Sequence, residues 1–218
     1  MSVKSIIAVD GPAASGKSTV AKKLAEKLSI TYLSSGSVYR AITYVCLTNN
    51  IVADNEKIKF FLKHYNVRTK YGKIFINHTD YSQYLSLPET EKNVSKYSAL
   101  AYVREFTLEI LRNTAKHESI VMDGRDIGTA VFPDANYKFF LTASTEVRAK
   151  RRYDEFCKTH PKEKIELKTI LSEIIQRDEM DETRELSPLK KAEDAILIDN
   201  SKLNIEETIQ TIYNYIHK

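Results

Sequence analysis

The chain has 218 residues, 42% of them hydrophobic and 28% charged, and a formal net charge of +4 at pH 7. This length and apolar content favour one compact domain with its own buried core, and they exclude a disordered chain or a small fold that depends on disulfides. The mild positive charge suits anionic small molecules and does not call for a nucleic-acid partner, so we expect none.

Cys46 and Cys157 lie far apart in the sequence, so neither a disulfide framework nor a zinc site is predicted. The apolar run at residues 6–9 ends at Asp10, which makes it too short for a signal peptide or a membrane-spanning helix. We therefore expect a cytoplasmic protein with no membrane attachment.

A phosphate-binding loop is predicted directly after this first apolar run. Its pattern is Gly, four residues, then Gly-Lys-Ser, and helical spacing of Val20, Ala21, Leu24 and Leu28 follows it. A buried strand, a glycine loop and a helix start together form a cradle for nucleotide phosphates, whereas a plain tight turn would leave the lysine unpaired beside a helix N-terminus. The residues expected to hold ATP are Gly11, Pro12, Ala13, Ala14, Ser15, Gly16, Lys17, Ser18 and Thr19.

A second strand-to-helix corner follows at residues 31–36. A short strand at 31–33 ends in Ser34-Ser35-Gly36, and the next helix carries Tyr39 and Arg40 in its first turns. Hydroxyl groups at a helix start suit either an anion or a simple cap, so the corner is read as a possible anion site or as a serine cap with a surface arginine.

Residues 56–111 interrupt the strand and helix alternation. A short helix at 56–64 precedes two strand-like arms at 67–70 and 73–77 around Tyr71-Gly72, which predicts a hairpin. A helix at 88–101 and a second one with Arg104 at the edge of its apolar stripe follow. This segment is interpreted as an inserted subdomain.

The third parallel strand, at 119–122, runs straight into Asp123-Gly124-Arg125-Asp126. Ligands of open parallel sheets bind at the carboxyl ends of the strands, so Asp123 is a candidate for holding Mg²⁺ directly or through water. A turn with a solvated Arg-Asp pair is the alternative. Strands at 138–141 and 195–198, helices at 145–159 and from 166 to about 180, and a last helix at 205–216 complete the chain.

The helix that begins near Glu166 carries a wide apolar stripe that gives way to charge. Continued at 100° per residue, the stripe leads to Arg177, Asp181 and Arg184, which should project together from its shoulder. They form either a surface salt bridge or part of a polar ligand site. Similarly, Arg148, Arg151 and Arg152 on the preceding helix are either a solvated face or a phosphate clamp.

These cations outnumber what one triphosphate needs. Transfer of a phosphoryl group between two phosphates requires charge compensation on donor, acceptor and transition state, which is the electrostatic task of a nucleotide kinase. The cations concerned are Lys17, Arg40, Arg125, Arg148, Arg151, Arg152, Arg177 and Arg184.

Over nearly its whole length the sequence resembles the bacterial cytidylate kinases, a family of nucleoside monophosphate kinases. The resemblance rests on the phosphate loop at 11–19, Ser-Gly-Ser-Val-Tyr-Arg at 35–40, the long motif from Asp123 to Ala135, and Arg-Asp-Glu-Met-Asp-Glu-Thr-Arg at 177–184 with Ser-Pro-Leu at 187–189. The first motif is common to all P-loop proteins, whereas the last two are close to specific for this family.

The resemblance implies a single α/β domain with five parallel strands in the order 2-3-1-4-5, flanked by helices. It divides the chain into a core (1–34, 113–147 and 165–218), a monophosphate-binding region with the insert (35–112), and a short lid (148–164). It further implies the transfer of a phosphoryl group from ATP to CMP, and to dCMP, by a monomer that uses Mg²⁺.

The resemblance also assigns roles to single positions. Ser35, Arg40, Arg125 and Arg184 would hold the CMP phosphate, Ser95, Arg104 and Asp126 the cytosine edge, and Arg177 and Asp181 the ribose, with Tyr39 also at the substrate. Lys17, Arg125, Arg184 and Arg151, the last helped by Arg148 or Arg152, would act on the transferring phosphoryl. Ser18, and Asp123 through water, would hold Mg²⁺.

Two departures from the family pattern affect these assignments: Ser34 stands where many members carry Asp, and Ser86-Leu87-Pro88 replaces a frequent arginine. Adenylate, thymidylate, UMP/CMP and shikimate kinases share the loop and sheet, and they remain alternatives, as does a nucleotide-dependent switch. The switch is disfavoured because the sequence has no Asn-Lys-x-Asp motif for guanine.

Overall fold

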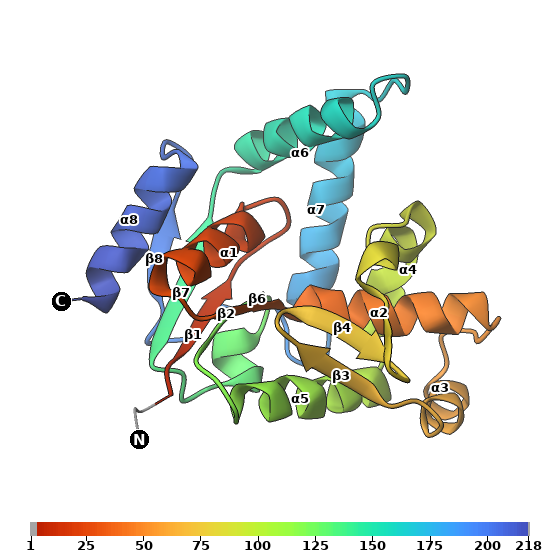
Figure 1. Ribbon diagram of the computed structural model, residues 1–218. Coiled ribbons are helices and arrows are strands. Elements are labelled where there is room, and N and C mark those ends of the chain that lie inside the picture. Colours follow the sequence, from red (N-terminus) through yellow and green to blue (C-terminus); the bar gives the residue numbers. More distant parts are fainter. Residues whose placement is uncertain (1–3, 218) are drawn as a thin grey trace.

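The computed structural model describes residues 4–217 and is built on a five-stranded parallel sheet (Figure 1). The strand order is β2-β6-β1-β7-β8, with neighbours in parallel register. Counted within this sheet alone, the order is 2-3-1-4-5, as expected. The strands are β1 (Ile6–Asp10), β2 (Thr31–Ser34), β6 (Ile120–Gly124), β7 (Tyr137–Thr142) and β8 (Ile196–Asp199).

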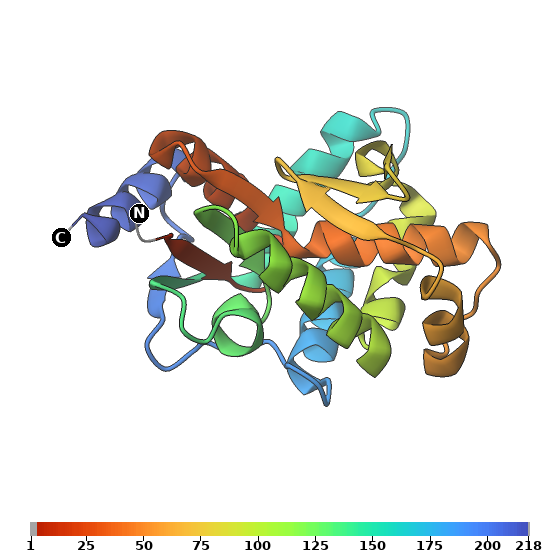
Figure 2. The same ribbon diagram turned by 60° about the horizontal axis from the view of Figure 1, so that its bottom comes forward.

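Helices cover both faces of the sheet. Helices α1 (Lys17–Leu28) and α8 (Ile205–Ile216) pack on one face, and α2 (Ser35–Thr48) and α5 (Ala101–Ala115) pack on the other, where they also touch each other (Figure 2). The alternation in β1 explains this, because Ile7 and Val9 point into the first layer and Ala8 into the second. The short π-helix η2 (Ile127–Val131) closes the second layer beside β1.

The chain between β2 and β6 forms a subdomain beside the sheet. It contains a three-stranded antiparallel sheet, β3-β4-β5. The two-residue strand β5 and the 3₁₀ helix η1 that follows it were not predicted. Its elements are α2, α3 (Asn55–Leu62), β3 (Val67–Lys70), β4 (Lys73–Ile76), β5 (Thr79–Asp80), η1 (Ser82–Tyr84), α4 (Pro88–Ser98) and α5.

The turn of the β3-β4 hairpin lies against the edge strand β2. A Cβ atom placed on Gly72, whose φ is +73°, would lie 2.6 Å from the carbonyl oxygen of Tyr32. Only glycine combines this left-handed conformation with so close an approach. The hairpin is therefore fixed to the core at its tip as well as at its base.

Two helices in contact with each other, α6 (Thr145–Thr159) and α7 (Leu167–Thr183), lie beyond the carboxyl edge of the sheet, with α6 crossing the upper end of α7 in Figure 1. Helix α7 is longer than predicted and includes Arg177 and Asp181. Arg184 follows the helix in an extended conformation, so its expected place on the helical face is wrong, although its side chain still returns to Asp181. Within residues 4–217, no helix is long and apolar enough to cross a membrane.

Candidate active site

The predicted phosphate loop connects β1 to α1 at the carboxyl edge of the sheet. Gly11 is required by sterics, because a Cβ there would lie 2.0 Å from the carbonyl oxygen of Leu141. Lys17 is buried and donates a hydrogen bond from Nζ to the carbonyl of Pro12 over 2.8 Å. Burial, reinforced by the charge of Arg125, lowers the pKa of Lys17 well below its usual value. An anion in the loop would reverse this destabilisation of the ammonium group.

A buried ion pair between α6 and α7 is hydrogen-bonded to the backbone of the phosphate loop at Ala13. The amide of Ala13 donates to Asp178 Oδ1 over 3.0 Å, and Arg148 Nη1 donates to the carbonyl of Ala13 over 3.0 Å. Arg148 and Asp178 also bond to each other. The next residue, Ala14, has a left-handed φ of 55°, which costs a non-glycine residue about 1 kcal/mol. Arg148 is thus a structural clamp on the loop in this conformation.

Ser18 and Asp123 bring hard oxygen donors together beside the loop. The Ser18 hydroxyl donates to Asp123 Oδ2 over 2.7 Å, and the Tyr32 hydroxyl donates to Asp123 Oδ1 over the same distance. Asp123 is only 2% exposed. Burial and the Asp123 charge raise the pKa of Tyr32, so the phenol stays a donor. Carboxylate and hydroxyl oxygens of this kind suit Mg²⁺.

A cavity of about 340 Å³ opens beyond the loop. We call it the acceptor cavity, after the substrate that the sequence resemblance leads us to expect there. It is enclosed by the phosphate loop, the start of α2, the end of β6, α4 and α7. The polar residues lining it are Lys17, Ser18, Ser34, Ser35, Arg40, Glu91, Ser98, Asp123, Arg125, Asp126, Arg152, Glu155, Glu173, Arg177, Asp181 and Arg184, with Tyr39 beside them.

Two carboxylates organise the arginines of this cavity. Asp181 accepts a hydrogen bond from Arg125 Nε over 2.7 Å and lies 3.6 Å from Arg184 Nη1. Asp126 bonds to Arg104 and lies 3.5 Å from Arg184 Nη2. Burial would raise the pKa of Asp181, but Arg125 and its neighbours outweigh burial and hold it below its usual value. Both carboxylates therefore have arginine partners.

Cationic groups remain in excess around the cavity. The Nε atoms of Arg40 and Arg177 are buried and have no hydrogen-bond partner. Burial lowers the pKa of both side chains, and in Arg177 the nearby charge of Arg125 lowers it further. Helix α2 begins at Ser35, and the side chain of the preceding Ser34 accepts no hydrogen bond from the first amides of the helix. These amides are therefore further donors without a side-chain cap. Buried donors without partners are costly unless a ligand satisfies them, and an anion is the ligand that these donors fit.

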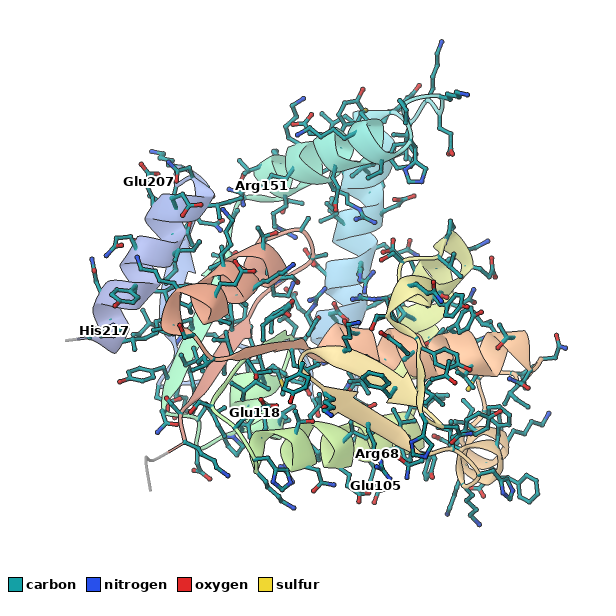
Figure 3. All side chains as sticks on the ribbon, in the orientation of Figure 1. Arg68, Glu105, Glu118, Arg151, Glu207 and His217 are labelled. Atoms are coloured by element: carbon teal, nitrogen blue, oxygen red, sulfur yellow. The ribbon has the colours of Figure 1, made fainter. Side chains whose placement is uncertain are left out.

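A second cavity, of about 680 Å³, lies on the other side of the loop between α1, α6 and the β8-α8 connection. We call it the donor cavity, after the nucleotide that the sequence resemblance leads us to expect there. Arg151 lies on the side of α6 that faces α8 (Figure 3) and donates to the carbonyl and Oδ1 of Asn200 over 2.8 and 2.9 Å. Asn200 in turn donates to the Ser15 carbonyl over 3.0 Å. The two cavities share Ala14, Arg152 and Glu155 in their walls.

The family model for cytidylate kinase matches residues 7–218. The chain belongs to the cytidylate kinase family. A cytidylate kinase of Clostridium botulinum (strain Okra / Type B1) is 46% identical over 216 residues, with 97% of both chains covered. One of Chloroherpeton thalassium is also 46% identical, with 96% of this chain and 92% of the relative covered.

Solved structures of low sequence identity share the fold. An uncharacterised protein of Eubacterium ventriosum superposes with a TM-score of 0.56 at 18% identity, covering 99% of each chain. A shikimate kinase of Bacteroides thetaiotaomicron gives 0.50 at 14%, covering 98% of this chain and 99% of that one. At such identity the likeness concerns the sheet and its helices alone, and it agrees with the predicted P-loop kinase fold.

Most positions suggested by the cytidylate kinase motifs meet in the acceptor cavity. Arg104 lies just behind its wall, bonded to Asp126 and to the carbonyl of Ser98, with its guanidinium 5.6 Å from the Tyr39 ring centre. Ser95 does not line the cavity, since α4 presents Glu91, Val94 and Ser98 there instead. Arg151 faces the donor cavity, whereas Arg152 borders both.

Four residues important for the arrangement were missed by sequence reasoning. Asp178 is adjacent to a motif arginine, but nothing local shows that it bonds to Ala13. Tyr32 lies in a short predicted strand, and nothing there indicates its hydrogen bond to Asp123. Glu91 lies in a predicted helix, and nothing there indicates its ion pair with Arg152. Asn200 follows the last strand at the carboxyl edge, and that position is the one available signal that could have revealed it.

Proposed function

We propose that the protein transfers the γ-phosphoryl group of ATP to CMP, and to dCMP, giving ADP and CDP or dCDP. The observation that carries the proposal is the pair of cavities that meet at the phosphate loop, one of them lined by five arginines, of which Arg40 and Arg177 have buried Nε atoms without a hydrogen-bond partner. A P-loop protein that only hydrolyses a nucleotide has no need for a second site whose cationic side chains could bind another anion. Membership of the cytidylate kinase family supports CMP as the acceptor.

In this proposal the acceptor cavity binds the monophosphate nucleotide. Ser35, Arg40, Arg125 and Arg184 hold its phosphate, for which Arg40 has an unpartnered buried donor. Arg177 and Asp181 hold the ribose hydroxyls, with Tyr39 at the wall. Asp126 and Arg104, which form an ion pair with each other, contact the cytosine edge. Ser95 remains a predicted base contact that would require α4 to move.

The donor cavity and the loop would bind ATP. Residues 11–19 cradle the phosphates, and Lys17 leaves the Pro12 carbonyl for a phosphate oxygen. Mg²⁺, held by Ser18 and through water by Asp123, would supply charge neutralisation at the donor phosphates. The described residues contain no cluster of three or more metal-ligating side chains, so phosphate and water would complete its coordination.

This chain's part in catalysis is positioning and charge compensation. A phosphate oxygen of CMP is already an anion, so its in-line attack needs no general base. Lys17, Arg125 and Arg184 would offset charge on the donor and acceptor, and Arg151 would approach from α6. Arg152, which borders both cavities and now pairs with Glu91 over 2.9 Å, is equally placed to help.

Closure of two mobile parts would exclude water. We assign them to the monophosphate-binding region at 35–112 and the lid at 148–164, around the core at 1–34, 113–147 and 165–218. The Arg152–Glu91 ion pair joins α6 to α4 across the mouth between these parts. The pair shows that the two parts can be in direct contact over the site, which is the contact that closure would need. A monomer in the cytoplasm without a nucleic-acid partner remains our prediction.

The acceptor is tested by steady-state phosphorylation of CMP, dCMP, UMP, AMP and shikimate by the purified protein with Mg·ATP. We expect the highest kcat/KM with CMP or dCMP. Fastest turnover of any other acceptor, or ATP hydrolysis that no acceptor stimulates, would overturn the proposal.

The assigned residues are tested by Lys17→Ala and Arg184→Ala, each of which should lower kcat by about 10²-fold or more, by analogy with loss of an arginine finger. Lys22→Ala is the control, because Lys22 is exposed on the same helix as Lys17. Near-normal CDP formation by both variants would contradict the assignment.

A further inference from the structure

Asp10 is a buried carboxylate that none of the motif assignments uses. It is the last residue of β1, directly before Gly11, and is only 4% exposed. Its Oδ1 accepts a hydrogen bond from the amide of Ile127 over 2.8 Å, and its Oδ2 accepts one from the amide of Gly128 over 2.7 Å. It forms no ion pair within residues 4–217.

The two amides that Asp10 holds follow Arg125 and Asp126 without a gap. Arg125 and Asp126 line the acceptor cavity. Arg125 bonds to Asp181, and Asp126 pairs with Arg104 and Arg184. Asp10 thus fixes the backbone immediately after them, while its own backbone continues into the phosphate loop. One carboxylate thus links the start of the phosphate loop to the segment that would contact the acceptor nucleotide.

An aspartate is a costly choice at this position. Burial raises the pKa of Asp10 to about 7, and the charge of Asp126 raises it while that of Lys17 lowers it. Lys138 of β7 runs alongside, with its stem near Gly128. A neutral side chain would avoid the desolvation of a charge, but only a carboxylate offers two equivalent oxygens to two parallel amides.

We propose that Asp10 is a positioning residue for the acceptor nucleotide, which holds Arg125 and Asp126 in the orientation that binds CMP. The inference rests on the proposed CMP kinase activity. It differs from a purely structural role, which would affect unfolding and leave nucleotide affinities alone. It also differs from a role at ATP, because Asp10 has no hydrogen bond to the phosphate loop among those of the described residues.

The test is Asp10→Asn, which keeps the shape but replaces one acceptor with a donor that faces an amide. Loss of this charge-assisted bond should raise the Kd for CMP, measured by calorimetry without ATP, about tenfold. The KM for ATP should stay within about twofold. Asp134→Asn, the same change at an exposed position after η2, is the control and should leave both constants unchanged.

The pH dependence of CMP binding distinguishes the effect of the Asp10 charge from the effect of the side chain's shape. As pH falls from 8.5 to 6, the wild-type carboxyl becomes protonated, so the ratio of the variant's Kd to the wild-type Kd should shrink. Titration of the CMP phosphate affects both proteins and cancels in this ratio. If Asp10→Asn is too unstable to measure, Asp10→Ser, which leaves room for a bridging water, replaces it.

Wild-type Kd for CMP in a folded Asp10 variant would overturn the inference, as would an equal loss of ATP affinity or a ratio that does not change with pH. Failure of the wild-type protein to phosphorylate CMP would instead overturn the proposed function. The two failures are therefore distinguishable.

Discussion

Removal of the Asp178 carboxylate should both destabilise the protein and loosen the phosphate loop. The Arg148 and Asp178 side chains are 7% and 11% exposed. Breaking a buried pair of this kind costs about 3–5 kcal/mol, because the remaining charge stays buried without its partner. Asp178→Ala also leaves the Ala13 amide without its acceptor. We therefore expect a loss of about 4 kcal/mol, a large part of the 5–15 kcal/mol typical of a folded domain.

Urea unfolding measures this loss, and steady-state kinetics should show a raised KM for ATP, since Ala13 and the left-handed Ala14 lose their support. Asp154→Ala is the control, because it removes an exposed pair with Lys150 on α6 and should cost less than about 1 kcal/mol. The double variant Arg148→Met/Asp178→Leu should regain stability without regaining ATP affinity. If Asp178→Ala unfolds at the same urea concentration as Asp154→Ala, the clamp does not stabilise the loop as reasoned.

Two further changes probe the neighbouring contacts. Tyr32→Phe removes the hydrogen bond to Asp123, so we expect urea unfolding to show about 1.5 kcal/mol less stability and steady-state kinetics to show a raised KM for Mg²⁺. The control is Tyr71→Phe at an exposed ring, which should change neither value. The folded-state pKa of Asp10, about 7, lies above its ordinary 3.8, so the folded protein binds the extra proton and its stability falls as pH rises through 7. Relative to Asp10→Asn, the wild-type free energy of unfolding should decrease by about 2 kcal/mol between pH 5.5 and 8, and a constant difference in urea titrations at the two pH values would refute this.

The parts of the fold set by local pattern could be predicted from the sequence. The loop at 11–18, the strand order and most helix ends follow from apolar periodicity, glycine placement and the family resemblance, and the structure has them within a few residues. The gathering of Arg125, Asp126 and Asp181 was also accessible, because strand ends and one helix face determine it.

Contacts between distant residues were not accessible. Asp178 and Ala13 are 165 residues apart, and Tyr32 and Asp123 are 91 apart, so no periodicity links their side chains. Arg184 shows a different limit, because its position was inferred from a helix that ends one residue earlier, at Thr183. Its side chain is oriented by the hydrogen bond from Nε to the Ser187 carbonyl, over 2.7 Å, and not by the helix. Helix phase predicts direction only while the helix continues.

The contact between the hairpin turn and β2 bears on where this enzyme can be engineered and on its tendency to aggregate. A turn such as Tyr71-Gly72 would ordinarily be chosen for inserting a tag or a fluorophore, because loop tips tolerate added residues. Here the turn abuts the outermost strand of the sheet at Tyr32, where extra chain would have no room. The same turn shields an edge whose unpaired backbone groups would otherwise be open to another molecule's strand. Shortening the hairpin would therefore expose the core sheet to edge-to-edge association, a consequence for aggregation as much as for catalysis.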